Sequence, residues 1–198
     1  VLHEPGDIVT LAGTRFVVLD VERRGSLPDS LFLLALESVG TSEFGNSNNY
    51  AESDLKKAVD KWLEDMDKRG LDNAKLIPRE IDLTTLDGSG CYGKLSVKAA
   101  PLTLDEAREY ADIIPNAERW CWLATGWSGP SKSDGDLALY VSSSGGWNGG
   151  GCSDSYGIRP ALKAPSILFE DSEAGLDLSK IPTDDLLQEI HRRLAEKA

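Results

Sequence analysis

The sequence predicts an α+β protein with two helices, a small and mostly antiparallel sheet, and a further helix at the C-terminus. Helical spacing of apolar residues is confined to segments that begin near Ser53, Thr103 and Thr183. Short apolar runs typical of strands occur elsewhere, and several of them lie in the second half of the chain. Helices and strands therefore do not alternate one for one, which favours the α+β class over an alternating α/β domain.

The opening residues predict a β-hairpin and a third strand. Segments 8–11 and 15–21 are rich in β-branched and apolar residues, and the turn sequence Ala12-Gly13-Thr14 joins them. The continuous apolar run 31–37 predicts a buried strand. Residues 42–49 are polar, so we expect a loop there.

Each of the first two helices has a capping signal at its start. Ser53 is a suitable N-cap for the first helix, with Asp54 in the first turn. Thr103 begins the second helix, and Glu106 three residues later completes a capping box. Pro115 is expected to end that helix. The apolar positions expected to face the core are Leu55, Val59, Trp62, Leu63 and Met66 in the first helix, and Leu104, Ala107, Tyr110, Ala111 and Ile114 in the second.

The remaining strands are expected around 120–123, 137–141 and 158–162, and residues 71–93 predict a loop with short extended pieces. Residues 1–164 then form one domain. That length suffices for a full core, because a domain of about 150 residues already buries close to 70% of the surface of its unfolded chain.

Residues 165–198 form a separable tail, in which an acidic linker precedes an amphipathic helix. Ile167-Leu168-Phe169 predicts a last short edge strand, and Thr183 is expected to cap the helix. A helix this short is marginal alone. We expect it to pack on the same chain, or else on a neighbouring subunit or partner, which would allow self-association. Its apolar stripe consists of Leu186, Leu187, Ile190 and Leu194.

The composition is that of an acidic globular protein. The net charge is −12, with 40% hydrophobic and 27% charged residues. Binding to nucleic acid requires clustered Lys and Arg that neutralise phosphates, so we expect none here. The given residues contain no stretch approaching the roughly 20 apolar residues of a membrane helix, and we expect no membrane insertion.

Residues that usually carry catalysis or bind metals are sparse. His3 and His191 lie at opposite ends of the chain, far in sequence from any candidate nucleophile. Asp134-Gly135-Asp136 has alternating carboxylates but lacks the further ligands of a calcium loop. We therefore expect no catalytic residues, no metal and no cofactor.

The three cysteines, Cys91, Cys121 and Cys152, match no zinc-binding spacing. Three reduced thiols are one interpretation; a single disulfide, Cys121–Cys152 or Cys91–Cys121, is the other. Cys121 lies between two tryptophans and is expected to be buried. Cys152 lies in a polar run and is expected to be exposed.

That polar run, residues 142–155, is the most unusual segment. Every residue in it except Trp147 is Ser, Gly, Asn, Cys or Asp. The run has few apolar side chains to offset its own ordering entropy, yet apolar segments flank it. It is either a flexible surface loop or a permissive binding surface held between rigid anchors. Trp127 and Trp147, which lie in polar surroundings, either cover the edge of the core or serve as exposed aromatic anchors.

The flanks of the run resemble a known family. Trp120-x-Trp122-Leu123, Ala138-x-Tyr140-Val141 and Gly157-Ile158-Arg159-Pro160-Ala161-Leu162 are similar to the closing half of a C-type-lectin-like domain of the bacterial and phage type. That group includes the variable proteins of diversity-generating retroelements and the formylglycine-generating enzymes. The earlier part of the chain agrees with the order of elements in that family, so the resemblance spans residues 5–164. The segments that agree are 5–9, 16–19, 31–35, 50–63 and 102–107.

The resemblance implies a binding domain rather than an enzyme. Formylglycine-generating relatives use a cysteine pair in the closing half, but no match to their catalytic motif surrounds Cys121 or Cys152. Calcium-dependent lectins use a Trp-Asn-Asp sequence, whereas Gly149 holds the third position here. Arg159 is expected to pair with a carboxylate or with carbonyls behind the loop. The positions expected to form the fixed scaffold are Trp120, Trp122, Gly157, Arg159 and Pro160.

Retroelement-diversified proteins, as the resemblance implies, acquire substitutions at adenines, chiefly in asparagine codons. Ser, Gly, Asp and Cys each arise from an asparagine codon through changes at its adenines, whereas Trp does not. Apart from Trp147, the run 142–155 holds only those residues and Asn148. It therefore has the composition of a variable region in which Trp147 is fixed.

These observations lead to the hypothesis of a non-enzymatic protein that binds an unidentified protein or surface ligand through a diversified surface. The alternatives are an undiversified phage or cell-surface module of the same fold and, less favoured, an oxidase of the formylglycine type. The location stays open between the cytoplasm and a phage virion. The predicted ligand-binding residues are Trp127, Ser128, Lys132, Asp134, Asp136, Ser142, Ser143, Ser144, Gly146, Trp147, Gly149, Gly150, Gly151, Cys152, Ser153, Asp154 and Ser155.

Overall fold

The computed structural model describes residues 3–25, 27–169, 183 and 187. The described chain is α+β, as predicted, with two α-helices and mostly antiparallel sheets. One small sheet was expected, which is wrong, because the strands form two five-stranded sheets and one two-stranded sheet. Apart from residues 183 and 187, the predicted acidic linker and C-terminal helix lie outside the described residues.

The first five-stranded sheet has the order β1-β2-β3-β12-β7 and is antiparallel throughout. It confirms the predicted hairpin, whose turn has Ala12 at φ 46° and Gly13 at φ 76°. The third strand begins earlier than expected and ends at Ala35. The strands are β1 (Ile8–Leu11), β2 (Thr14–Arg24), β3 (Leu27–Ala35), β7 (Ala99–Ala100) and β12 (Ala161–Pro165).

The second five-stranded sheet has the order β10-β9-β8-β11-β4, and the β11–β8 pair is its one parallel pair. Two of its strands lie where loops were expected. β4 overlaps the start of the polar segment 42–49, and β10 falls within the polar run. The strands are β4 (Thr41–Glu43), β8 (Cys121–Gly126), β9 (Leu137–Val141), β10 (Trp147–Gly151) and β11 (Ser155–Gly157).

Both predicted helix starts are confirmed. Helix α1 (Asp54–Lys68) begins after Ser53, whose Oγ accepts a hydrogen bond from the Lys56 amide at 2.9 Å. Helix α2 (Leu104–Glu109) has the predicted capping box between Thr103 and Glu106. It ends well before Pro115, because the amides of Ile113 and Ile114 both turn back to the carbonyl of Tyr110.

Short elements complete the fold. A two-stranded sheet of β5 (Arg79–Asp82) and β6 (Lys94–Val97) follows α1. The 3-10 turns are η1 (Tyr50–Glu52), η2 (Asn73–Lys75) and η3 (Ser166–Phe169). The turn η3 replaces the edge strand expected at 167–169. None of the helices in the described part of the chain has the length and apolar character needed to cross a membrane.

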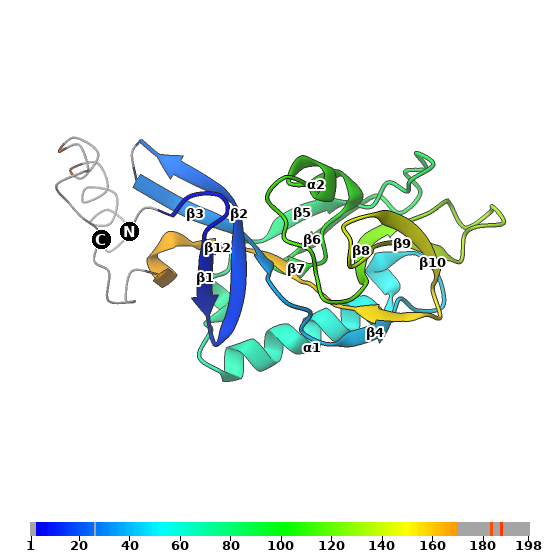
Figure 1. Cartoon of the computed structure of the whole chain (residues 1–198), viewed down its shortest axis with the longest axis horizontal. Helices are drawn as coiled ribbons and strands as arrows, with labels where there is room; N and C mark the ends of the chain where they lie inside the picture. The colour runs from blue at the N-terminus through cyan, green and yellow to red at the C-terminus, as the bar shows by residue number, and fades with distance from the viewer. Residues whose placement is uncertain (1–2, 26, 170–182, 184–186, 188–198) are drawn as a thin grey trace.

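The buried apolar side chains form two hydrophobic clusters, and strands of the sheets contribute residues to both. Along β2, Phe16 and Val18 belong to the larger cluster, while Val17 and Leu19 belong to the smaller one. Helix α1 packs on the larger cluster and α2 on the smaller. Because α1 contacts β4 of one sheet and β7 of the other, it runs beneath both, as Figure 1 shows.

Residues 158–160 link the two sheets rather than forming the start of a strand, as had been expected. β11 ends at Gly157 in the second sheet, and β12 begins at Ala161 in the first. The carbonyl of Pro160 accepts from the Ala35 amide at 2.9 Å, so the link is held at the end of β3.

Candidate ligand-binding face

The polar run forms a β-hairpin with β9 and then crosses to the other side of β8, where β11 lies between β8 and β4. Its tight turn is closed by the amide of Ser142, which donates to the carbonyl of Gly146 at 2.7 Å. The hydroxyl of Ser142 accepts from the Gly146 amide at 3.0 Å. Gly145 has φ 84°, a backbone conformation that favours glycine. Ser143 and Ser144 project from this turn into solvent.

Two aromatic rings cover Gly149 and Gly150 of β10, one on each face of the sheet. A Cβ on Gly149 would lie 2.6 Å from Cε3 of Trp127, and one on Gly150 would lie 2.6 Å from Cε2 of Tyr156. The run is therefore ordered by its backbone pairing with β9 and by rings from elsewhere in the chain. Gly149 and Gly150 were predicted to bind ligand; a ring occupies the space that a side chain would take at each, so a larger residue does not fit at either position.

Asn48 closes the base of the loop between β8 and β9. Its Nδ2 donates to the carbonyls of Ser128 at 2.8 Å and Leu137 at 3.0 Å, and its Oδ1 accepts from the Tyr92 hydroxyl at 2.6 Å. Ser128 is only 3% exposed. The prediction that Ser128 contacts ligand at the surface is therefore wrong, because its backbone is drawn inward to Asn48.

Lys132, near the tip of this loop, is paired with a carboxylate. Its Nζ lies 2.5 Å from Oδ2 of Asp87, and the other oxygen of that carboxylate, Oδ1, accepts from the Thr85 hydroxyl. These hydrogen bonds, the one from Lys132 foremost, lower the pKa of Asp87 to about 2. Lys132, Asp134 and Asp136 are exposed, as a surface role requires.

The turn between β10 and β11 is held by Asp154. Its Oδ2 accepts from the Gly151 amide at 2.9 Å and from the Tyr156 hydroxyl at 3.1 Å. Cys152 is 4% exposed, so its expected exposure is wrong. Its amide donates to the carbonyl of Asp136 and its carbonyl accepts from the Gly45 amide, which fixes Cys152 between two neighbouring segments.

Aromatic rings in mutual contact extend from the core to the surface at the start of β8. Trp122 is buried, and its Nε1 donates to the Ser42 carbonyl at 2.9 Å. Trp120 is 45% exposed and stacks on Tyr140 with ring centroids 4.9 Å apart and planes 7° apart. Both tryptophan rings contact Tyr140 and Tyr156, so they lie on the same side of the sheet, as residues two apart on a strand do. They differ in depth, with Trp122 in the core and Trp120 at the surface.

An open hollow of about 370 Å³ adjoins Trp120. Ser143 of the hairpin turn and Ser155 of β11 line it, so the fold brings these two predicted residues together. Trp120 and Gly157, which also line it, were predicted as scaffold residues, whereas the remaining lining residues, Thr41, Glu118, Arg119 and Tyr156, were not predicted to belong to the site.

Trp147 lies away from this hollow, near α2. It pairs with Val141 across the β9–β10 ladder and is 43% exposed, and the Arg108 guanidinium lies 5.6 Å from the centre of its ring. Trp127 is half-buried against the smaller hydrophobic cluster, which agrees with the alternative that it covers the edge of the core. The two predicted anchors therefore differ, and only Trp147 is well exposed.

The predicted ligand-binding residues fall into three groups by exposure. Exposed members are suited to contact a ligand, half-buried ones less so, and buried ones not at all. The exposed positions are Lys132, Asp134, Asp136, Ser143, Ser144, Gly146, Trp147, Ser153, Asp154 and Ser155; the half-buried ones are Trp127, Ser142, Gly149 and Gly151; the buried ones are Ser128, Gly150 and Cys152.

Arg159 holds the link between the sheets by hydrogen bonds to carbonyls. Its Nε donates to Ala35 O at 2.9 Å and its Nη1 to Pro115 O at 3.1 Å. The residue is 6% exposed. Of the two kinds of partner expected for Arg159, carbonyls are therefore the ones found.

The three cysteines are free thiols, and only Cys91 is exposed. Burial raises the pKa of Cys121 to about 11 and that of Cys152 to about 12. The ring of His3 packs against that of Phe169, with the ring centroids 5.8 Å apart. The other histidine, His191, lies outside the described residues. Within the described residues, no group of three or more His, Cys, Asp or Glu side chains is placed to hold a metal ion.

Comparisons with protein-family models, curated proteins and solved structures found no match to this chain. The resemblance to a C-type-lectin-like domain therefore stays a prediction carried by the residues quoted above.

Proposed function

We propose that this protein is a non-enzymatic binding protein that presents a diversified ligand-binding face on a C-type-lectin-like scaffold. The observation that carries the proposal is the hollow beside Trp120, where a rigid, exposed aromatic ring adjoins small hydroxyl side chains of the polar run. Aromatic anchors among adaptable hydrogen-bonding groups are the chemistry of binding loops in antibodies.

The rigidity of Trp120 supports its role as an anchor. Its ring stacks on Tyr140 and meets the edge of Tyr156 at 5.6 Å, and both of those rings contact buried Trp122. Binding through a ring that is already fixed in place costs little conformational entropy. The scaffold thus presents Trp120 ready for contact.

The exposed positions of the run are the ones proposed to vary. Ser143 and Ser144 lie at the hairpin turn, and Ser153 and Ser155 lie around β11. Substitution of exposed side chains away from special features usually changes stability by within about 0.5 kcal/mol. Variation is therefore proposed to be confined to these and similar exposed positions. Gly149 and Gly150, whose side-chain space is filled, and the buried Cys152 are proposed to stay constant.

The encoding locus provides the direct test of diversification. We expect a reverse transcriptase gene and a near-copy of the segment that encodes Trp120 to Leu162, differing from it only at adenines. If no such copy lies nearby, the diversified function is refuted and the undiversified module of the same fold replaces it.

A pair of libraries tests the binding face itself. The first randomises Ser143, Ser144, Ser153 and Ser155 through adenine-randomised asparagine codons, and the control library randomises the buried Ser128, Gly150 and Cys152 in the same way. We expect most members of the first library to melt cooperatively and some to bind an immobilised test protein, and most members of the control to unfold. Equal loss of folded members in both libraries, or no enrichment of binders in the first, would contradict the proposal.

The oxidase alternative gains no support from the thiols. A thiolate is the reactive form of cysteine, and burial disfavours it at both Cys121 and Cys152. The proposed function therefore assigns these two cysteines to the packing of the second sheet.

A further inference from the structure

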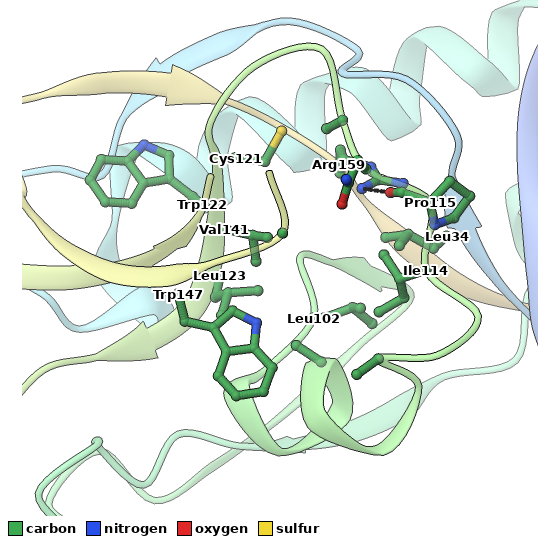
Figure 2. A pocket seen from close by; sticks show the side chains of 15 residues that line it. Leu34, Leu102, Ile114, Pro115, Cys121, Trp122, Leu123, Val141, Trp147 and Arg159 are labelled. Atoms are coloured by element: carbon green, nitrogen blue, oxygen red, sulfur yellow. Dashed lines mark hydrogen bonds between the residues drawn. The ribbon is translucent and has the colours of Figure 1, made fainter. Parts of the chain in front are cut away.

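A second, smaller cavity lies on the side of the sheet that faces α2, away from the hollow beside Trp120. It has a volume of about 90 Å³. Figure 2 shows Trp147 at one end of the cavity and Arg159 at the other, with Leu102, Leu123 and Val141 between them. A site that holds one water needs only about 10–15 Å³ by this kind of measure. The cavity therefore has room for a small organic group.

Arg159 brings a buried positive charge to this apolar cavity. Two of its nitrogens donate to backbone carbonyls, but Nη2 is buried and has no hydrogen-bond partner among the described residues. No carboxylate in the described part of the chain forms an ion pair with it. Glu37 and the Cys121 thiol are the ionisable groups near enough to influence it, and Glu37 is paired with Arg15.

A buried cation without a counter-ion is energetically unfavourable, and guanidinium remains charged in proteins. Nη2 of Arg159 is therefore suited to donate to an anion that also has an apolar part, which would pack on the apolar lining of the cavity. Carboxylates meet this requirement, because they form strong charge-assisted hydrogen bonds with guanidinium.

We propose that the cavity between Trp147 and Arg159 binds a small monocarboxylate, whose carboxylate accepts from Nη2 of Arg159 and whose apolar tail packs on Leu102, Leu123 and Val141. The mouth lies where Ala111 and Trp147 are exposed. Arg108, whose guanidinium lies over the Trp147 ring, is paired there with Asp105 at 3.3 Å, so the buried Arg159 is the cation that the proposal assigns to the ligand.

The size of the cavity limits the ligand. An apolar cavity of about 150 Å³ in another protein accommodates benzene, so a space of about 90 Å³ that opens at Trp147 suits a short aliphatic acid or a benzoate whose edge reaches the mouth. Butanoate and benzoate are therefore the probes, with 1-butanol and benzyl alcohol as their uncharged counterparts. The proposal does not depend on the diversified function, since the lining of the cavity lies outside the hollow beside Trp120.

The test is a titration of the full chain with each acid and each alcohol. Binding is measured by calorimetry and by the NMR signals of the Arg159 and Trp147 side-chain N–H groups. We expect at least one acid to bind saturably with a dissociation constant on the order of 1 mM or tighter, and its alcohol at least about tenfold more weakly. The N–H signals of both side chains should shift during the acid titration.

Two substitutions at the mouth locate the site without disturbing Arg159. Ala111→Phe places a ring in the cavity and should abolish binding, whereas Asp112→Phe places the same ring one residue further on, outside the lining, and should leave binding unchanged. Arg159→Met should weaken binding at least about tenfold if the variant still melts cooperatively. The proposal is overturned if neither acid binds saturably up to about 10 mM, if the alcohols bind equally well, or if Ala111→Phe binds like the unaltered protein.

Discussion

Gly150→Ala should destabilise the protein although it adds only one methyl group. The new Cβ would lie 2.6 Å from Cε2 and 3.0 Å from the hydroxyl oxygen of Tyr156. Carbon atoms in favourable contact are about 3.5–4.0 Å apart, so the two groups would overlap by about 1 Å. The Tyr156 ring has little freedom to retreat, because Trp122 lies 4.4 Å away by ring centroids and Asp154 holds the hydroxyl.

The expected loss is the overpacking cost less the entropic gain of replacing glycine. Overpacking of a filled core costs about 1–3 kcal/mol. A Gly→Ala change at a compatible backbone conformation stabilises by about 0.4–1 kcal/mol through the unfolded chain. We therefore expect a net loss of about 1–2 kcal/mol for Gly150→Ala, which lowers the melting temperature by roughly 2–8 °C in a domain of this size.

Gly151→Ala is the matched control on the same strand. Its Cβ would meet Oδ2 of Asp154 at 3.4 Å, an ordinary contact, and Gly151 does not have positive φ. Thermal melts followed by circular dichroism should show Gly151→Ala unchanged or slightly stabilised. Equal melting temperatures for the two variants would refute the inference that Tyr156 fills the space above Gly150.

Four further substitutions test the scaffold. Trp122→Ala should cost about 3–5 kcal/mol as a core truncation, whereas Trp120→Ala should cost below about 1.5 kcal/mol because mainly ring stacking is lost; similar urea midpoints would contradict this contrast. Asn48→Ala strands two carbonyls and a hydroxyl, so we expect a loss of roughly 2–4 kcal/mol and faster proteolysis within 129–136, and unchanged cleavage would count against the role of Asn48. Lys132→Met should raise the pKa of Asp87 from about 2 toward its ordinary value of 3.8, as followed by carboxyl NMR signals. Because that pKa is lowered in the folded protein, the contribution of Asp87 to stability is complete above pH 3.8 and is lost as the pH falls toward 2. An Asp87 pKa unmoved by the substitution would show that the ion pair does not form in solution.

Local signals in the sequence predicted local structure well. The capping box at Thr103 and the N-cap at Ser53 are each formed by residues within three positions of one another, so their chemistry is visible in the sequence. The same holds for the hairpin at Ala12 and Gly13. The end of α2 was less predictable, because Tyr110 turns the chain before Pro115 is reached.

The order of the polar run was not predictable from the run itself. Its own residues have few apolar side chains, and the rings that cover Gly149 and Gly150 come from Trp127 and Tyr156. Asn48 was missed for a related reason, since its partners lie 80 and 89 residues away in sequence. Composition indicates what a segment contributes to packing, but not what distant segments contribute to it.

The edge strand β10 of the second sheet also affects the solubility of the protein. An exposed strand with free amide groups is a template onto which another chain can add, which leads to aggregation. In β10 the amide of Gly151 is occupied by the Asp154 carboxylate and that of Gly149 by the Asn148 side chain. Asp, Asn and Ser can all accept such a bond. A segment that changes among these residues can therefore alter its surface while retaining its protection against intermolecular sheet growth.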